Sequence, residues 1–274
     1  MKKSLLCYFI VFLMCLTGGI TAATEFDFNG SVQMNAFINN NVQDISLLGG
    51  TKIVTKVKVN DKLSGEIDQR TTLNRAYFNY KFNNMVLTVG KTYSPIDFYY
   101  SYQAWAGNEL YGAGYFYGGT VPLLALKVDN TSVAVVQSSI VNDNVIPKVQ
   151  VAQAISVADT VIDLGVEYDA KPKKWQAGIG IKQKIEDLLI AGSGYTTEED
   201  GSLGVVAVVR YLMNKIITLE AGYGSWKPSE TATAIVMYYG QLKYALDDGF
   251  YLIPEIGSSV KETNYYGMKI QIDF

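Results

Sequence analysis

The last nine residues carry the pattern that most limits the fold of this chain. From Tyr266 to Phe274, an apolar or aromatic side chain stands at every even position and glycine or a polar side chain at every odd one. A repeat of two is the spacing of a β-strand with one apolar and one polar face. Because 49% of the chain is hydrophobic, nine matching positions arise by chance on the order of once in 500 trials at a given location. The pattern predicts a strand that runs to the final residue.

The remaining composition narrows the fold class to two. No apolar run after residue 23 reaches the roughly 20 residues that a membrane-spanning helix needs. The chain is rich in tyrosine, phenylalanine, valine and isoleucine and contains 25 glycines. These features favour either a soluble all-β protein or a membrane β-barrel, the one strand architecture in which no unpaired backbone group faces lipid.

The first 23 residues have the features of an export signal. Lys2 and Lys3 precede an apolar stretch over 5–16, and small residues over 21–23 form a cleavage site. The apolar stretch is about a dozen residues long, too short to span a bilayer. We therefore expect a cleaved signal peptide over 1–23 and one mature domain over 24–274. Cleavage removes Cys7 and Cys15, so no disulfide is expected, and the residues before Cys15 do not fit a lipoprotein signal.

The terminal strand resembles the end of bacterial outer-membrane barrels, which finish on such a strand with a terminal phenylalanine. The resemblance implies that Phe274, Ile272 and Ile270 form an assembly signal that the barrel-assembly machinery reads. It also implies an all-β transmembrane antiparallel β-barrel, surrounded by the lipid of a Gram-negative-type outer membrane.

The rest of the chain divides into strands separated by polar tight turns. Seven turns, with both chain ends on the same side, predict sixteen strands; fourteen or twelve remain compatible with the pattern. The predicted turns lie at 60–61, 83–84, 129–130, 158–159, 186–187, 214–215 and 247–249. The predicted strands are 25–38, 50–59, 62–70, 73–82, 85–94, 119–128, 131–138, 146–156, 160–169, 174–184, 188–197, 203–213, 216–225, 232–246, 250–260 and 264–274.

One connection, 94–118, is much longer than the others and is the third outer loop. This loop, the strand number and the terminal phenylalanine together resemble the general trimeric porins, as does the hairpin 75–91 that precedes the loop. The resemblance implies a water-filled channel for passive diffusion of ions and small hydrophilic solutes, a homotrimer, and a third loop folded into the lumen. The chain is shorter than typical members, which bears on the strand number and on the trimer.

Alternation also assigns side chains to the two faces of the wall. In the strand 50–59, Ile53 and Val57 face outward while Lys52, Lys56 and Lys58 face inward. A lysine or arginine facing lipid near the midplane costs roughly 2 to 4 kcal/mol, so charged faces are expected around water. Further side chains expected to face inward are Glu66, Asp68, Arg70, Arg75, Lys182, Arg210, Glu220, Lys243 and Glu255.

The porin resemblance implies a constriction between a basic wall and an acidic loop. The wall would consist of Lys52, Lys56, Lys58, Arg70, Arg75 and Lys91, with Glu66 and Asp68 also lining the pore. Asp97 and Glu109 would lie opposite, on the long loop. A transverse field of this kind orients dipolar solutes. In the alternative interpretation these charges hold the loop by ion pairs or lie at the rims.

The long loop contains nine aromatic side chains between Phe98 and Tyr117. Aromatic rings stack on sugar rings, which would suit a carbohydrate-selective channel. They are equally expected in the interfacial girdle of a barrel and in a folded loop that needs packing.

Other function classes have less support. The chain has no histidine, on which the known barrel lipases and proteases depend, and it contains no serine elbow, metal-ligand cluster or phosphate-binding loop in a fitting context. We therefore expect no enzyme activity and no cofactor. The mature chain carries 21 basic and 26 acidic side chains, unlike a nucleic-acid-binding protein. A structural or adhesive barrel remains open if the interior is filled.

Overall fold

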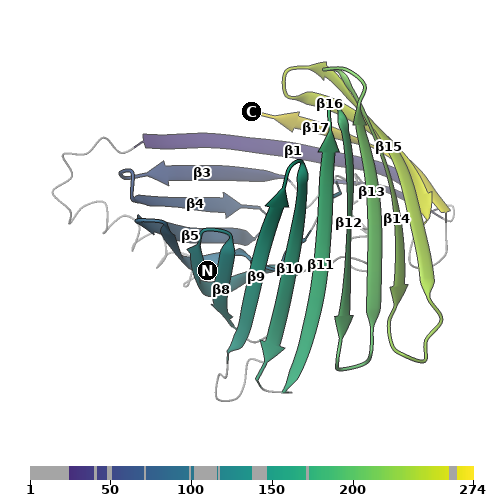
Figure 1. Ribbon diagram of the computed structural model, residues 1–274. Coiled ribbons are helices and arrows are strands. Elements are labelled where there is room, and N and C mark those ends of the chain that lie inside the picture. The colour runs from purple at the N-terminus through teal and green to yellow at the C-terminus, as the bar shows by residue number, and fades with distance from the viewer. Residues whose placement is uncertain are drawn as a thin grey trace.

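A single antiparallel sheet closes on itself to form the molecule (Figure 1). The computed structural model describes residues 25–39, 42–47, 51–70, 72–98, 100–101, 116, 118–137, 147–170, 173–258 and 264–274. From β3 onward each strand pairs with the next in sequence, and the purple β1 (Glu25–Asn39) and yellow β17 (Asn264–Asp273) lie side by side and close the circle. Within these ranges, no helix is both long and apolar enough to span a bilayer.

The barrel has sixteen strand positions, which confirms the predicted number. Seventeen segments form the sheet, but β2 (Val42–Leu47) and β3 (Lys52–Lys58) share one position because both pair with β1. β2 pairs along residues 34–39 of β1 and β3 along residues 25–31. The segment β2 was not predicted from the sequence.

The other strands lie within three residues of their predicted bounds. They are β4 (Leu63–Gln69), β5 (Leu73–Phe82), β6 (Met85–Tyr93), β7 (Thr120–Val128), β8 (Thr131–Val136), β9 (Lys148–Val157), β10 (Thr160–Asp169), β11 (Lys174–Ile185), β12 (Leu188–Thr197), β13 (Leu203–Leu212), β14 (Ile217–Lys227), β15 (Ile235–Asp247) and β16 (Phe250–Ser258). The predicted turns all connect consecutive strands at one edge of the barrel.

The chemistry of these turns explains why the chain reverses where it does. Asn83 and Asp129 have φ values of 52° and 50°, in the left-handed region that asparagine and aspartate tolerate and that two-residue hairpins require. Asn60 and Asn214 act differently, since each side-chain oxygen accepts two backbone N–H groups at 2.8 to 2.9 Å. The turn residues therefore satisfy the backbone locally and set the register of the strands.

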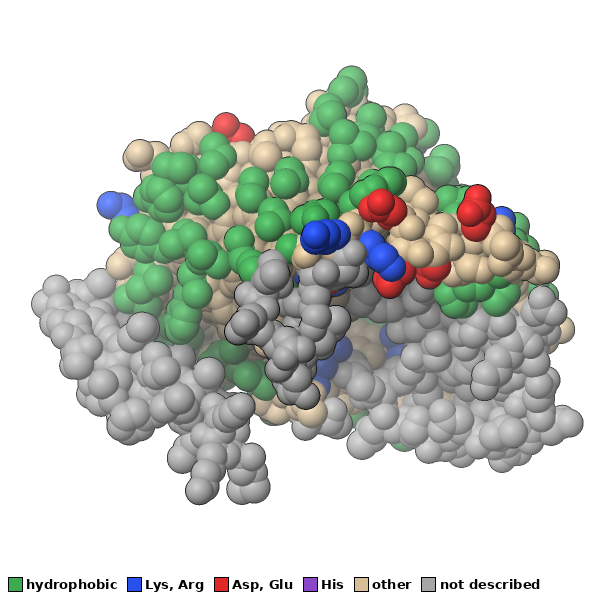
Figure 2. Space-filling model, turned by 90° about the horizontal axis from the view of Figure 1, so that it is seen from below, with side chains coloured by type: hydrophobic (Ala, Val, Ile, Leu, Met, Phe, Trp, Pro, Cys, Tyr) green, Lys and Arg blue, Asp and Glu red, His purple; other side chains and the backbone are tan. Residues whose placement is uncertain are grey.

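The terminal strand shows how the two faces of the wall differ. Tyr266 and Ile272 are exposed on the outer face, whereas Tyr265 and Lys269 are buried on the inner face. Phe274 continues this strand and exchanges two backbone hydrogen bonds with Gly30 of β1, at 2.7 and 3.1 Å. Apolar side chains cover much of the visible outer wall (Figure 2), as lipid contact requires.

Candidate functional site

The inner face of the barrel is divided into a covered half and an open half. The covered half consists of the inward side chains of β9 to β17, many of which are fully buried. They include Gln150, Ala152, Glu167, Ser193, Val206, Val208, Glu220, Met237, Tyr239 and Tyr265. The open half lies on β1 and β3 to β5, where Asp27, Lys56 and Lys58 have side chains that are 65, 54 and 51% exposed, although Ser31 and Asp68 on these strands are buried.

The long loop after β6 supplies part of the cover. Ser94 donates from its hydroxyl to Gln150 Oε1 at 2.7 Å, which attaches the start of the loop to β9. Ile96, Phe98 and Phe116 are buried in one cluster with Ala152 of β9. Since these contacts lie on the inner face, the described residues of the third loop lie inside the barrel, as predicted.

The loop then continues along the wall toward β13 and β14. The Tyr100 hydroxyl donates to Asp163 Oδ2 of β10 at 2.6 Å, and Arg210 Nη2 of β13 donates to the Tyr100 carbonyl at 2.8 Å. Ser101 Oγ donates to Glu220 Oε1 of β14 at 3.2 Å, and Glu220 is itself bonded by Arg210 Nε at 2.6 Å. Strand alternation predicts that Arg210 and Glu220 face the interior, but their contact with the loop has no signal in the sequence.

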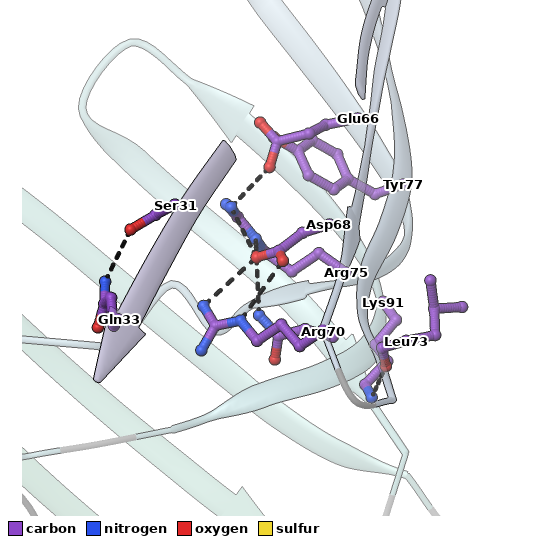
Figure 3. A network of polar contacts seen from close by, with 10 residues as sticks. Ser31, Gln33, Glu66, Asp68, Arg70, Leu73, Arg75, Tyr77 and Lys91 are labelled. Carbon is purple, nitrogen blue, oxygen red and sulfur yellow. Dashed lines mark hydrogen bonds and ion pairs between the residues drawn. The ribbon is translucent and has the colours of Figure 1, made fainter. Parts of the chain in front are cut away.

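A charged network occupies the wall of β4 and β5 (Figure 3). Arg75 Nη2 lies 2.7 Å from Glu66 Oε1 and 3.1 Å from Asp68 Oδ2. Arg70 Nη2 lies 3.4 Å from the same Asp68 oxygen, and Asp68 is fully buried. The structure therefore brings four predicted pore residues together, but as a network in which two acids balance the two arginines.

Three predicted lysines lie on the neighbouring strand β3. Lys56 and Lys58 pair with Asp27 and Asp61 at 3.9 and 3.1 Å, and all four side chains are more than half exposed. Both lysines line a recess of about 420 Å³ together with Glu66 and Tyr77. Lys52 lies on the same face by alternation and pairs in register with Ser31 of β1. In the view along the barrel, Lys and Arg side chains are visible inside the hollow between the grey segments (Figure 2).

Lys91 is not brought to this wall. It is in register with Ala76 and Pro122, and the inward positions of β6 are those opposite Tyr77 and Asn79 instead. The Lys91 ammonium donates to the Leu73 carbonyl at 2.8 Å, away from the arginines (Figure 3). Its outward position on β6 separates it from the basic cluster, and the Leu73 carbonyl accepts one of its hydrogen bonds.

The predicted acidic side of the constriction is placed only in part. Asp97 is largely buried, its Oδ1 atom has no hydrogen-bond partner, and burial raises the pKa of its carboxyl to about 7. It forms no ion pair with a lysine or arginine of the described wall. Glu109 lies outside the described residues. Within those residues, no three His, Cys, Asp or Glu side chains are grouped to hold a metal ion.

Solved structures with the same architecture are outer-membrane proteins. A mutant of Rh. blastica porin matches with a TM-score of 0.66 and 12% identity, over 91% of this chain and 100% of the porin. OmpT, an outer membrane protein of Vibrio cholerae solved in a trimer form, matches with a TM-score of 0.63 and 14% identity, over 92% of this chain and 100% of OmpT.

The sequence of the chain does not assign it to a known family. No protein-family model matches the chain, and no curated protein matches it. The likeness to solved structures spans nearly the whole chain but has low identity, so it establishes the architecture alone. The closed sixteen-position barrel, the inward third loop and these neighbours agree: the chain has the fold of the general outer-membrane porins.

Proposed function

We propose that the protein is an outer-membrane channel through which ions and small hydrophilic solutes diffuse passively along the open half of the lumen. The observation that carries this proposal is the asymmetry of the inner face. The loop lies against β9 to β14, while Asp27, Lys56 and Lys58 stay exposed on the other side. Exposed ions of both signs on an inner wall are favourable only beside water.

Purified protein in a planar bilayer tests the proposal. A diffusion channel gives stepwise current that rises in proportion to voltage. Silence from a folded barrel, recognised by a gel mobility that changes on heating, would contradict conduction and favour a structural or adhesive role.

Charge on the open half is proposed to set the ion selectivity. The wall is less basic than the sequence predicts, because Glu66 and Asp68 balance the charges of Arg70 and Arg75. Charge reversal at Lys56 should therefore shift the reversal potential in a salt gradient toward cations. An unchanged potential would remove Lys56 from the conducting path.

Location and assembly are part of the same proposal. We place the mature domain, 24–274, in the outer membrane after cleavage of residues 1–23, with Phe274, Ile272 and Ile270 as the signal for the assembly machinery. The trimer form of the OmpT neighbour supports a homotrimer here. Normal outer-membrane levels of a chain that lacks Phe274 would contradict the assembly role, and chemical cross-linking of intact membranes tests the trimer.

The carbohydrate-channel alternative has less support from the described part of the loop. Phe98 and Phe116 are buried against the wall, where their rings serve packing. Saturable block of the current by an oligosaccharide would restore this alternative. An enzyme remains disfavoured because the chain lacks histidine.

A further inference from the structure

Three glycines lie beneath the loop on the inner face of β10 and β11. Gly165 and Gly178 are direct partners across the two strands. Gly180 follows on the same face, two residues along β11 and opposite Asp163. The three positions form a patch of wall that has no side chains, surrounded by strands that carry them.

Each glycine is in close contact with the loop. A Cβ atom at Gly165 would lie 2.9 Å from side-chain atoms of Ile96, Phe98 and Phe116. A Cβ at Gly178 would approach the Phe116 ring more closely still, and one at Gly180 would overlap the Tyr100 hydroxyl. Real Cβ atoms essentially never approach other heavy atoms within 3.0 Å. A side chain at any of the three positions would therefore displace atoms of the loop, which at Gly180 are those at the end of the flexible Tyr100 side chain.

Space, and not backbone conformation, accounts for these glycines. Among the described residues, the glycines with positive φ are Gly90, Gly119, Gly201 and Gly249, and none of the three beneath the loop is one of these. Glycine in a strand interior weakens the strand and often marks the close approach of another segment. Here the approaching segment is the loop itself.

We propose that Gly165, Gly178 and Gly180 form a seat that sets how deeply the loop lies against the wall, and thereby the cross-section of the open half. This inference rests on the proposed channel function. The segment 94–101 is held at its start by Ser94 on Gln150 and at its end by Ser101 on Glu220. Phe116 is joined to this segment by the Phe98 N–H, which donates to the Phe116 carbonyl at 3.0 Å. A side chain added to the seat therefore pushes Ile96, Phe98 and Phe116 away from the wall, toward the open half.

The test compares a methyl group added at the seat with one added elsewhere. Gly178→Ala should lower the single-channel conductance by an amount on the order of tens of per cent, since conduction depends on the pore cross-section, and Gly178→Val should lower it further. Gly240→Ala is the matched control. Gly240 also lies within a strand, but a Cβ there meets nothing within 4 Å, so its conductance should equal that of the wild type.

A compensating change separates the seat from a general effect on folding. Phe116→Ala removes the Cγ and Cδ1 atoms that a Cβ at Gly178 would meet most closely, so the double variant should recover conductance toward the wild-type value. If Gly178→Ala does not fold, Gly180→Ala takes its place because it meets only the end of the flexible Tyr100 side chain. Its partner for recovery is Tyr100→Phe, which removes the hydroxyl.

The outcomes distinguish the seat from the channel. A conducting wild type with folded Gly178→Ala or Gly180→Ala variants of unchanged conductance would overturn the seat alone, as would an equal fall in Gly240→Ala. A folded wild type that carries no current would overturn the proposed function.

Discussion

The covered and open halves of the inner face share one backbone pattern but differ in chemistry. In the covered half, Val206, Val208, Met237 and Tyr239 form a buried cluster, which resembles the core of a soluble protein. In the open half, inward side chains such as Lys56 are charged and exposed. Strand alternation thus decides which side chains point inward, while contact with the loop and with neighbouring inward side chains decides which of them lose water.

Polar groups in the covered half should therefore contribute more to stability than polar groups in the open half. Glu220 is buried and receives hydrogen bonds from Arg210, Ser101 and Gln241. Lys58 and Asp61 form an ion pair in which both side chains are mostly in water. Exposed ion pairs contribute little because water screens them, whereas breaking a buried pair leaves an uncompensated charge.

Removal of the buried carboxylate should have the largest effect. Glu220→Ala leaves Arg210 without its acid and removes the acceptor for Ser101, so we expect a loss of about 3–5 kcal/mol in stability. The loop should also detach, which would change conductance and raise current noise. Heat-dependent gel mobility and bilayer recordings measure the two effects. Glu199→Ala breaks an exposed pair with Lys174 and should change neither.

The second test unbalances the arginines of the open half. Asp68→Asn keeps the shape of the buried side chain but removes the charge that faces Arg70 and Arg75. We expect a shift of the reversal potential toward anions because the wall gains net positive charge. Lys91→Gln is the control, since Lys91 lies away from this network. Equal shifts in both variants would show that the network does not border the conducting path.

The third test uses the buried acid of the loop. The pKa of Asp97 rises from 3.8 to about 7 on burial, so the folded state binds a proton that the unfolded state has lost. As pH rises from about 4, ionisation of Asp97 in the unfolded state lowers the free energy of unfolding. The loss is complete above about pH 7. Asp97→Asn should remove this pH dependence, worth roughly 1–2 kcal/mol after allowance for screening. Thermal unfolding at pH 4 and pH 8 measures it; wild-type stability that is level or rises with pH would contradict the assignment.

The smallest effect is expected in the exposed pairs. Lys58→Gln should leave stability almost unchanged because its partner Asp61 is solvated. A small shift in selectivity toward cations should accompany it at low salt and fade at high salt, since ions screen exposed charges. A large loss of stability would mean that this end of the open half is covered after all.

Sequence alternation and turn chemistry were sufficient to predict most of the barrel. Both signals are local, because the strand period and residues such as Asn83 act within a few positions. β2 was not predicted because it does not add a strand position: β2 and β3 both pair with β1, along two different stretches of that strand. Lys91 was wrongly predicted in the basic wall because it was grouped with nearby basic side chains, without regard to the face of the strand on which it lies.

The site depended on contacts that are distant in sequence. The inward faces of Arg75 and Glu66 followed from alternation, but their mutual neutralisation depends on the register of β4 and β5. The seat was not visible either, because Gly165 and Gly178 gain meaning only when Phe116 lies over them. Residues that face the interior can be predicted from the alternation of their own strand. Residues that contact a loop distant in sequence can be identified only from the three-dimensional structure.

The pair of hydrogen bonds between Gly30 and Phe274 bears on the order of assembly. These residues belong to strands at opposite ends of the sequence, and contacts of such long separation carry the largest loop-closure cost. The pairing between β1 and β17 should therefore form last. Until it does, both strands are open edges, which readily pair with other chains. Hydrogen bonding of the final residue to Gly30 would thus pair the two open edges and end the period in which the barrel is prone to aggregate.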